Sequence, residues 1–149
     1  MAISSAICSS FKQELLQGKH SLDTSGNGGD SFKLALFTSS ASLDASTTAY
    51  STSNEVSGTG YSAGGTALTN TGVGLTSTTA FTDFSDVSFT SASFTANGCL
   101  IYNTTTAGGS GTTNAVCVVA FGGDKTVSSG TFTIQFPTND SSSAIIRLT

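Results

Sequence analysis

Charged side chains are scarce in this sequence. They make up 9% of its 149 residues, against roughly 25% in an average soluble domain, so Ser, Thr, Asn and Gly must cover most of the surface. The formal net charge is −4, and the basic residues are Lys12, Lys19, Lys33, Lys125 and Arg147. So small a basic set cannot neutralise a row of phosphates, which argues against nucleic acids and anionic membranes as partners.

Tryptophan is absent, and histidine occurs once, at His20. Without tryptophan the chain lacks an effective platform for stacking on sugars. A lone histidine, without a Gly-x-Ser-x-Gly elbow, gives neither a catalytic triad nor a metal cluster. We therefore predict that the protein is not an enzyme and binds no cofactor or metal. His20 follows a predicted helix end beside Lys19, where a charge that complements the helix dipole is expected.

Two acidic motifs invite a chemical interpretation. Asp83 and Asp86 resemble the paired carboxylates of glycoside hydrolases, but they stand among Ser and Thr at predicted strand ends, and we interpret them as solvated turn residues. Residues 23–30 have oxygen-bearing side chains at alternate positions, as in a calcium loop, yet Leu34 stands where an EF-hand requires Glu. A solvated loop is favoured over a calcium site there.

The three cysteines, Cys8, Cys99 and Cys117, are too few and too widely spaced for a disulfide framework. We interpret them as small buried hydrophobic side chains in a protein made in a reducing cytoplasm. An interchain link or a reactive thiol is the alternative. The amino terminus lacks the basic start and the apolar core of a secretory signal, and no membrane span is expected.

The length suits a single domain over residues 1–149. Residues 3–17 are predicted to form its one helix, because apolar residues recur there at every fourth position. The recurring residues are Ile3, Ile7, Phe11 and Leu15. Gly18 follows where a left-handed residue closes a helix. The apolar stripe either packs on the domain's own core or is a candidate interface with a neighbouring subunit.

Alternating apolar and polar residues predict strands along the rest of the chain. The predicted strands lie at residues 31–38, at 67–69 with 73–75 on the same edge, within 81–94, at 131–136 before Pro137, and at 144–148. The most apolar runs, 99–102 and 115–121, are predicted to form a central hairpin, with turns at 122–125 and 128–130. This pattern predicts an all-β domain, a β-sandwich or jelly roll with one N-terminal α-helix.

The segment 54–61 is predicted to be a tight structural turn. It contains Glu55, Gly58, Gly60 and Tyr61. The two glycines permit a positive φ or a close backbone approach that a side chain would block. The aromatic residue would fix the turn in place, and nothing in the segment is reactive.

Several short segments occur in a fixed order. Residues 11–18 read Phe-Lys-Gln-Glu-Leu-Leu-Gln-Gly, residues 32–38 Phe-Lys-Leu-Ala-Leu-Phe-Thr, residues 55–61 Glu-Val-Ser-Gly-Thr-Gly-Tyr, and residues 124–134 Asp-Lys-Thr-Val-Ser-Ser-Gly-Thr-Phe-Thr-Ile. Together they resemble small virion proteins of tailed bacteriophages, which are often labelled tail fibre or minor structural proteins. That family usually has Ala-Arg after the tyrosine, where Ser62 and Ala63 stand here.

The resemblance implies a non-enzymatic virion structural protein, assembled in the cytoplasm of a host bacterium. The leading hypothesis is a capsid decoration or cement protein that stabilises the head by contacts with the major capsid protein or other virion proteins. A homo-oligomer is expected, with a trimer favoured. In this hypothesis the N-terminal helix or the loop 39–54 contacts a neighbour, and the loop 103–114 faces outward.

Two alternatives remain open. A tail fibre, collar or baseplate component would belong to the same kind of particle and would differ in the number of copies. A carbohydrate-binding module on a jelly-roll scaffold is an alternative of a different class. It would have to expose Tyr50, Tyr61 or Tyr102 as a stacking platform.

Overall fold

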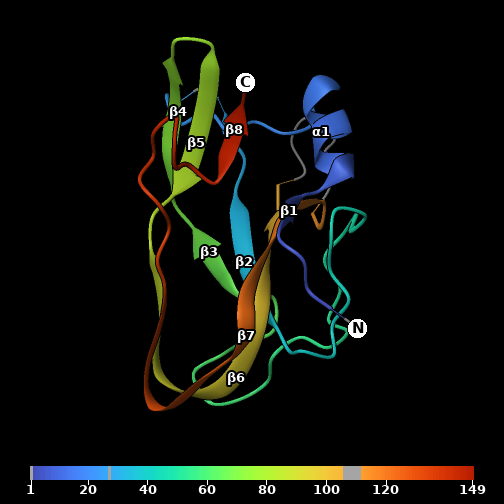
Figure 1. The fold of residues 1–149 in the computed structure, drawn as a ribbon, viewed down its shortest axis with the longest axis vertical. Helices are drawn as coiled ribbons and strands as arrows, with labels where there is room; N and C mark the ends of the chain where they lie inside the picture. Colours follow the sequence, from blue (N-terminus) through green and yellow to red (C-terminus); the bar gives the residue numbers. More distant parts are fainter. Residues whose placement is uncertain (1, 27, 106–111) are drawn as a thin grey trace.

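The computed structural model describes residues 2–26, 28–105 and 112–149. Their regular structure consists of two antiparallel sheets and one short helix near the amino terminus (Figure 1). The predicted all-β class is therefore confirmed. The elements are β1 (Ala6–Ile7), α1 (Ser9–Leu16), β2 (Phe32–Phe37), β3 (Thr66–Leu68), β4 (Asn70–Thr76), β5 (Thr79–Phe84), β6 (Val87–Asn103), β7 (Ala115–Ile134) and β8 (Ile146–Leu148). The larger sheet has the order β1-β7-β6-β2-β3 and the smaller one the order β4-β5-β8.

The two longest strands, β6 and β7, form an antiparallel ribbon at the centre of the larger sheet. Leu100 pairs with Val118 and Ile101 with Cys117, and all four residues are buried. On the other side of β6, Leu34 of β2 pairs with Ile101. The runs are apolar throughout because this part of the ribbon is covered on both faces, and the predicted central hairpin is confirmed. In Figure 1 the ribbon curves round at its lower end and returns along the left side.

The turns predicted at residues 122–125 and 128–130 are wrong, because both segments lie inside β7. The pairing with β6 shifts register at both places, and Gly122, Gly123 and Ser129 have positive φ. Glycine and serine are typical of turns and of β-bulges alike. Here the additional residues are accommodated as bulges, so the ribbon bends and the chain does not reverse.

β4 belongs to the smaller sheet, and the prediction that it continues the edge formed by residues 67–69 is wrong. The chain changes sheets at Thr69, whose carbonyl accepts the N–H of Ser85 at 2.9 Å. β4 then pairs with β5, and β5 pairs with β8 through Thr82 and Ile146. A change of sheet leaves the alternation of apolar and polar residues intact, so the sequence pattern does not show it.

α1 begins at Ser9, later than the predicted start at residue 3. Ile3 and Ile7 lie in an extended segment that contains β1. A spacing of four residues puts side chains on one face of a strand as well as on one face of a helix, and here pairing with β7 selects the strand. Gly18, with φ of 70°, ends the helix as predicted.

The cysteines lie in the core and are free thiols, as predicted from their number and spacing. Burial raises the pKa of Cys8 to about 11 and that of Cys99 to about 12. Burial also raises the pKa of Cys117. The thiolate, which is the reactive form, is therefore rare at neutral pH.

Candidate functional site

The large exposed apolar side chains of the described residues gather at one end of the molecule. Leu16 is 92% exposed, Leu75 72%, Val73 59% and Leu148 51%. They come from α1, β4 and β8, which lie together at the top of Figure 1. We call these four residues the apolar face.

Strand register explains why the sheet residues of the apolar face point the same way. Leu75 and Leu148 both stand opposite Ala80 of β5, so the three side chains form one row across the smaller sheet. Val73 is two residues from Leu75 in β4 and therefore shares its side of the sheet. A groove of about 620 Å³ between α1 and β8 adjoins this row and is lined by Leu16 as well as Leu148.

The helix residues predicted as an interface lie mostly against their own chain. Phe11 is buried, and Ile3, Ile7 and Leu15 are partly buried and packed on the core. All but Ile3 also line the groove beside β8. Helical periodicity therefore identified residues that pack on the core, of which only Phe11 and Leu15 belong to α1, and it did not single out Leu16. No local signal marks the exposed residues of β4 and β8, because their exposure depends on what covers the smaller sheet.

Glu55 of the predicted turn is the acceptor of a hydrogen-bond cluster. The hydroxyls of Tyr50 and Tyr61 donate to its carboxylate at 2.7 and 2.6 Å, and the N–H of Gly64 donates at 2.7 Å. The Tyr61 oxygen in turn accepts the N–H of Leu36 in β2 at 2.9 Å. Burial, followed by the hydrogen bond to Glu55, raises the pKa of both tyrosines. The phenols therefore remain donors, and they fix the turn to the larger sheet.

The glycines of the turn lie directly against β6. Gly58 has φ of 157° and Gly60 has φ of 80°. A Cβ at Gly58 would lie 2.4 Å from the carbonyl oxygen of Ser93, and one at Gly60 would lie 2.8 Å from Cα of Ala92. Between the two glycines, the carbonyl of Thr59 accepts the N–H of Ser93 at 2.9 Å. Both the backbone conformation and the close approach thus require glycine.

The three tyrosines considered as sugar platforms surround this turn. Tyr102 is buried, and its ring stacks on Tyr50 with centroids 4.5 Å apart and an interplanar angle of 9°. The ring of Tyr61 packs against Phe89 and Phe94. These rings are engaged in contacts within the chain, so their arrangement serves the fold.

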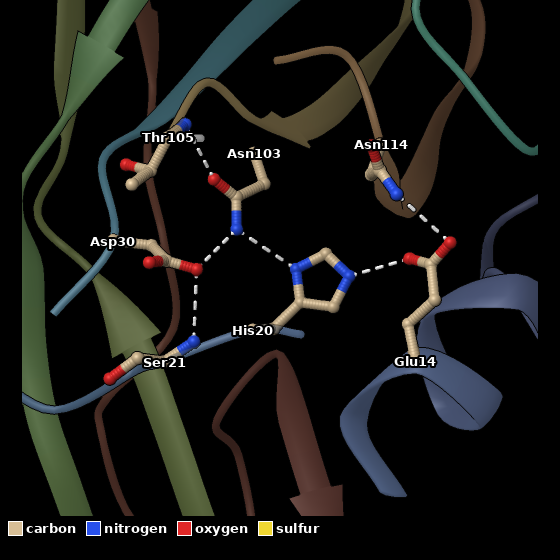
Figure 2. A network of polar contacts seen from close by, with 7 residues as sticks. All are labelled: Glu14, His20, Ser21, Asp30, Asn103, Thr105 and Asn114. Atoms are coloured by element: carbon tan, nitrogen blue, oxygen red, sulfur yellow. Dashed lines mark hydrogen bonds and ion pairs between the residues drawn. The ribbon is translucent and has the colours of Figure 1, made fainter. Parts of the chain in front are cut away.

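A second polar cluster joins α1 to the ends of β6 and β7 (Figure 2). Nε2 of His20 lies 2.6 Å from Oε2 of Glu14, and Nδ1 lies 3.0 Å from Nδ2 of Asn103. The same Nδ2 donates to Asp30 at 2.5 Å, and Asn114 donates to Oε1 of Glu14 at 2.9 Å. We call these five residues the His20 network.

His20 is buried between two side-chain partners, and the prediction that it supplies a charge at the helix end stays a prediction. Buried polar groups need partners, and both ring nitrogens of His20 have one. The partners come from separate segments of the chain, so only the fold brings them together. The prediction that the loop 103–114 faces outward is wrong for Asn103, which is buried at the end of β6. Residues 106–111 of that loop lie outside the described residues. Its two ends, Asn103 and Asn114, belong to the His20 network.

Asp83 is buried, and its interpretation as a solvated turn residue is wrong. Its two carboxylate oxygens accept the N–H of Phe84 at 2.8 Å and the N–H of Ile145 at 3.1 Å. Burial raises the pKa of this carboxyl. Asp86 is exposed, as predicted, and accepts the N–H of Phe136 at 2.7 Å. Both acids therefore hold backbone segments in place.

Within residues 2–26, 28–105 and 112–149, no group of three or more His, Cys, Asp or Glu is arranged to hold a metal ion. In the same part of the chain, no helix combines the length and the apolar character needed to cross a membrane. Comparison of the chain with protein-family models, curated proteins and solved structures found no match. The apolar face and the two polar clusters are the features on which a function can be proposed.

Proposed function

We propose that this chain is a non-enzymatic structural protein of a bacteriophage virion and that it decorates the capsid. The observation that supports this proposal is the apolar face. Exposed apolar side chains that gather on one part of a protein commonly mark a site of protein contact. The resemblance of four sequence segments to small tailed-phage virion proteins supports the same class.

The occupant of the apolar face, in this proposal, is the outer surface formed by the major capsid protein. Leu16, Val73, Leu75 and Leu148 supply apolar contact area. Lys12 and Arg147 line the adjoining groove together with Leu16 and Leu148, and they supply polar groups of the kind that surrounds the apolar centre of protein interfaces. Binding to the folded capsid stabilises it by mass action, and a trimer is the favoured form of the protein.

Mixing the purified protein with capsids that lack it tests the proposal. We expect a trimer, or a monomer that saturates the capsids at many copies and raises their thermal stability. The double variant Leu16→Ser, Leu75→Ser should lose this binding, while exposed substitutions of this kind change the free energy of unfolding by no more than about 0.5 kcal/mol each. Lys125→Ser, an exposed change on β7, is the control and should bind normally.

Other outcomes would replace the proposal. A protein that does not bind capsids and occurs at a few copies on isolated tails is a tail fibre, collar or baseplate component. A protein that binds neither particle but binds a glycan array is a carbohydrate-binding module.

A further inference from the structure

The His20 network holds a segment that belongs to neither sheet. Residues 18–26 and 28–31 follow α1 and lead into β2, and we call them the strap. Within the strap, Asp30 and Ser21 are joined twice, because each backbone N–H bonds to an oxygen of the other residue, at 2.9 and 3.0 Å. Asn103 at the end of β6 then binds Asp30 and His20 together (Figure 2). One amide thus fastens both ends of the strap to the larger sheet.

Two contacts fix the orientation of this amide. Oδ1 of Asn103 accepts the N–H of Thr105 at 2.8 Å, and a backbone N–H can only donate. Nδ2 donates to Oδ2 of Asp30, which also accepts the N–H of Ser21. Turning the amide over would place its NH₂ group against the N–H of Thr105 and its oxygen against the carboxylate of Asp30. Only one orientation satisfies the surrounding groups.

The orientation of the amide in turn sets the tautomer of His20. Nδ1 faces an N–H donor of Asn103 at 3.0 Å, so Nδ1 must accept and carries no proton. Nε2 faces the carboxylate of Glu14 at 2.6 Å, so Nε2 must donate. The other oxygen of that carboxylate is occupied by Asn114. The network therefore fits a neutral imidazole with its proton on Nε2.

We propose that the His20 network is a proton-operated latch on the strap. A second proton, placed on Nδ1, would point at the N–H of Asn103, so the contact would break and free the strap from β6. Closure then excludes a proton that the open form accepts, and by linkage a low pH favours the open form. The latch is a property of this chain alone and does not depend on the proposed virion function.

Several groups face the imidazole from the elements around it. Glu14 of α1 contacts Nε2, Asp30 of the strap acts through Asn103, and Lys19 adjoins His20 in sequence. The ring of Phe11 lies with its centroid 4.8 Å from that of His20. The two carboxylates attract a charged ring and oppose opening. The side chain of His20 is 0% exposed, however. A charged ring would therefore be buried with an N–H donor facing another donor, and we expect this cost to exceed the attraction of the carboxylates and to release the strap.

The tautomer can be measured without any variant, because His20 is the only histidine. NMR of the folded protein with ¹⁵N-labelled imidazole, at about pH 8 where an ordinary imidazole is neutral, should show an unprotonated Nδ1 and a protonated Nε2. A ring with its proton on Nδ1, or with protons on both nitrogens, would overturn the proposal.

Opening of the strap is measured by amide hydrogen exchange at about pH 8 and about pH 5, a range that spans the ordinary titration of imidazole. After correction for intrinsic exchange, protection of the strap should fall at the lower pH by more than about twofold and by no more than about tenfold per pH unit, which is the limit for a one-proton equilibrium. Protection of the β6 and β7 pairs should stay constant. Equal protection of the strap at the two pH values would contradict the latch.

His20→Gln and Lys19→Gln are the matched variants. Glutamine offers one donor and one acceptor but does not titrate, so in His20→Gln the protection of the strap should differ less than about twofold between the two pH values. Lys19→Gln removes a neighbouring charge outside the network and should respond as the unsubstituted protein does. A His20→Gln variant that keeps the full pH response would show that another group operates the strap.

Discussion

At the scale of single residues, the few acidic side chains act mainly as acceptors for donors of their own chain. Glu55 accepts two phenols and a backbone N–H, and Asp83 accepts two backbone N–H groups. Hydrogen bonds to a charged acceptor are stronger than those between neutral groups. In a chain with only 9% charged residues, these carboxylates fix loops and strand ends to the sheets.

Comparison of Tyr61→Phe with Tyr50→Phe tests this role of Glu55. Each variant removes one donor to Glu55, but Tyr61→Phe also leaves the N–H of Leu36 in a buried strand without its acceptor. We expect a loss in the free energy of unfolding of about 3 kcal/mol for Tyr61→Phe and about 1.5 kcal/mol for Tyr50→Phe. Urea denaturation measures both, and equal losses would contradict the bridging role of the Tyr61 hydroxyl.

Asp83 should give the protein a specific pH dependence. Burial raises the pKa of its carboxyl in the folded state above the ordinary value of 3.8. Between the ordinary pKa and the raised pKa, the folded state keeps a proton that the unfolded state has lost. Stability from this group therefore falls as the pH rises through that window. Asp83→Asn cannot ionise, and its free energy of unfolding should improve relative to the unsubstituted protein as the pH rises from about 4 to about 7.

Asp44→Asn is the control with the opposite sign. Hydrogen bonds from the hydroxyl and the backbone N–H of Ser46 lower the pKa of the exposed Asp44 carboxyl. Stability from Asp44 is present at higher pH and is lost as the pH falls. The free energy of unfolding of Asp44→Asn should therefore fall relative to that of the unsubstituted protein as the pH rises. Urea unfolding of both variants between about pH 4 and about pH 7 measures these changes. Changes of the same sign in the free energy of unfolding of the two variants would contradict the burial of Asp83.

At the scale of elements, irregular backbone gives the β6 and β7 ribbon its shape. The bulges near residues 122–123 and at 129 allow the ribbon to bend. The turn that contains Gly58 and Gly60 lies against β6, next to one of these irregular sites. Glycine thus has two uses here, since at some positions it only permits a positive φ and at others it also makes room for a neighbouring strand.

Gly60→Ala and Gly122→Ala separate these two uses. Both positions have positive φ, 80° and 72°, but a Cβ at Gly122 would meet nothing within 4 Å, whereas one at Gly60 would lie 2.8 Å from the backbone of β6. We expect Gly122→Ala to cost about 1 to 2 kcal/mol for the left-handed conformation alone. Gly60→Ala should cost about 2 kcal/mol more, because β6 must move. Similar losses in thermal or urea unfolding would show that the turn does not press on β6.

At the scale of the whole molecule, the two ends of the fold differ in character. The apolar face combines α1, β4 and β8 at one end (Figure 1). The curved end of the ribbon lies at the other (Figure 1). The ribbon carries exposed hydroxyls, such as those of Thr95 and Thr126, whose oxygens are 2.8 Å apart. This asymmetry suits a subunit that attaches at one end only. The capsid-binding experiment belongs to this scale, because the apolar face exists only when the smaller sheet and the helix are both in place.

The sequence by itself determined the features that depend on local pattern. Alternation over residues 31–38 predicted β2, two uniformly apolar runs predicted the buried half of β6 and β7, and Gly18 predicted the end of α1. These predictions succeeded because an alternating run, an apolar run and a glycine after a helix are each patterns of residues adjacent in the chain.

Tertiary structure decided everything for which one local pattern fits two structures. The spacing of Ile3 and Ile7 suits a helix or a strand, and pairing with β7 chose the strand. Glycine and serine at residues 122–130 suit a turn or a bulge, and the partner strand β6 chose the bulge. The burial of His20 and Asp83 and the exposure of Leu75 likewise depend on segments distant in sequence. The physical reason is that burial and pairing are properties of contacts, which a linear pattern limits but does not assign.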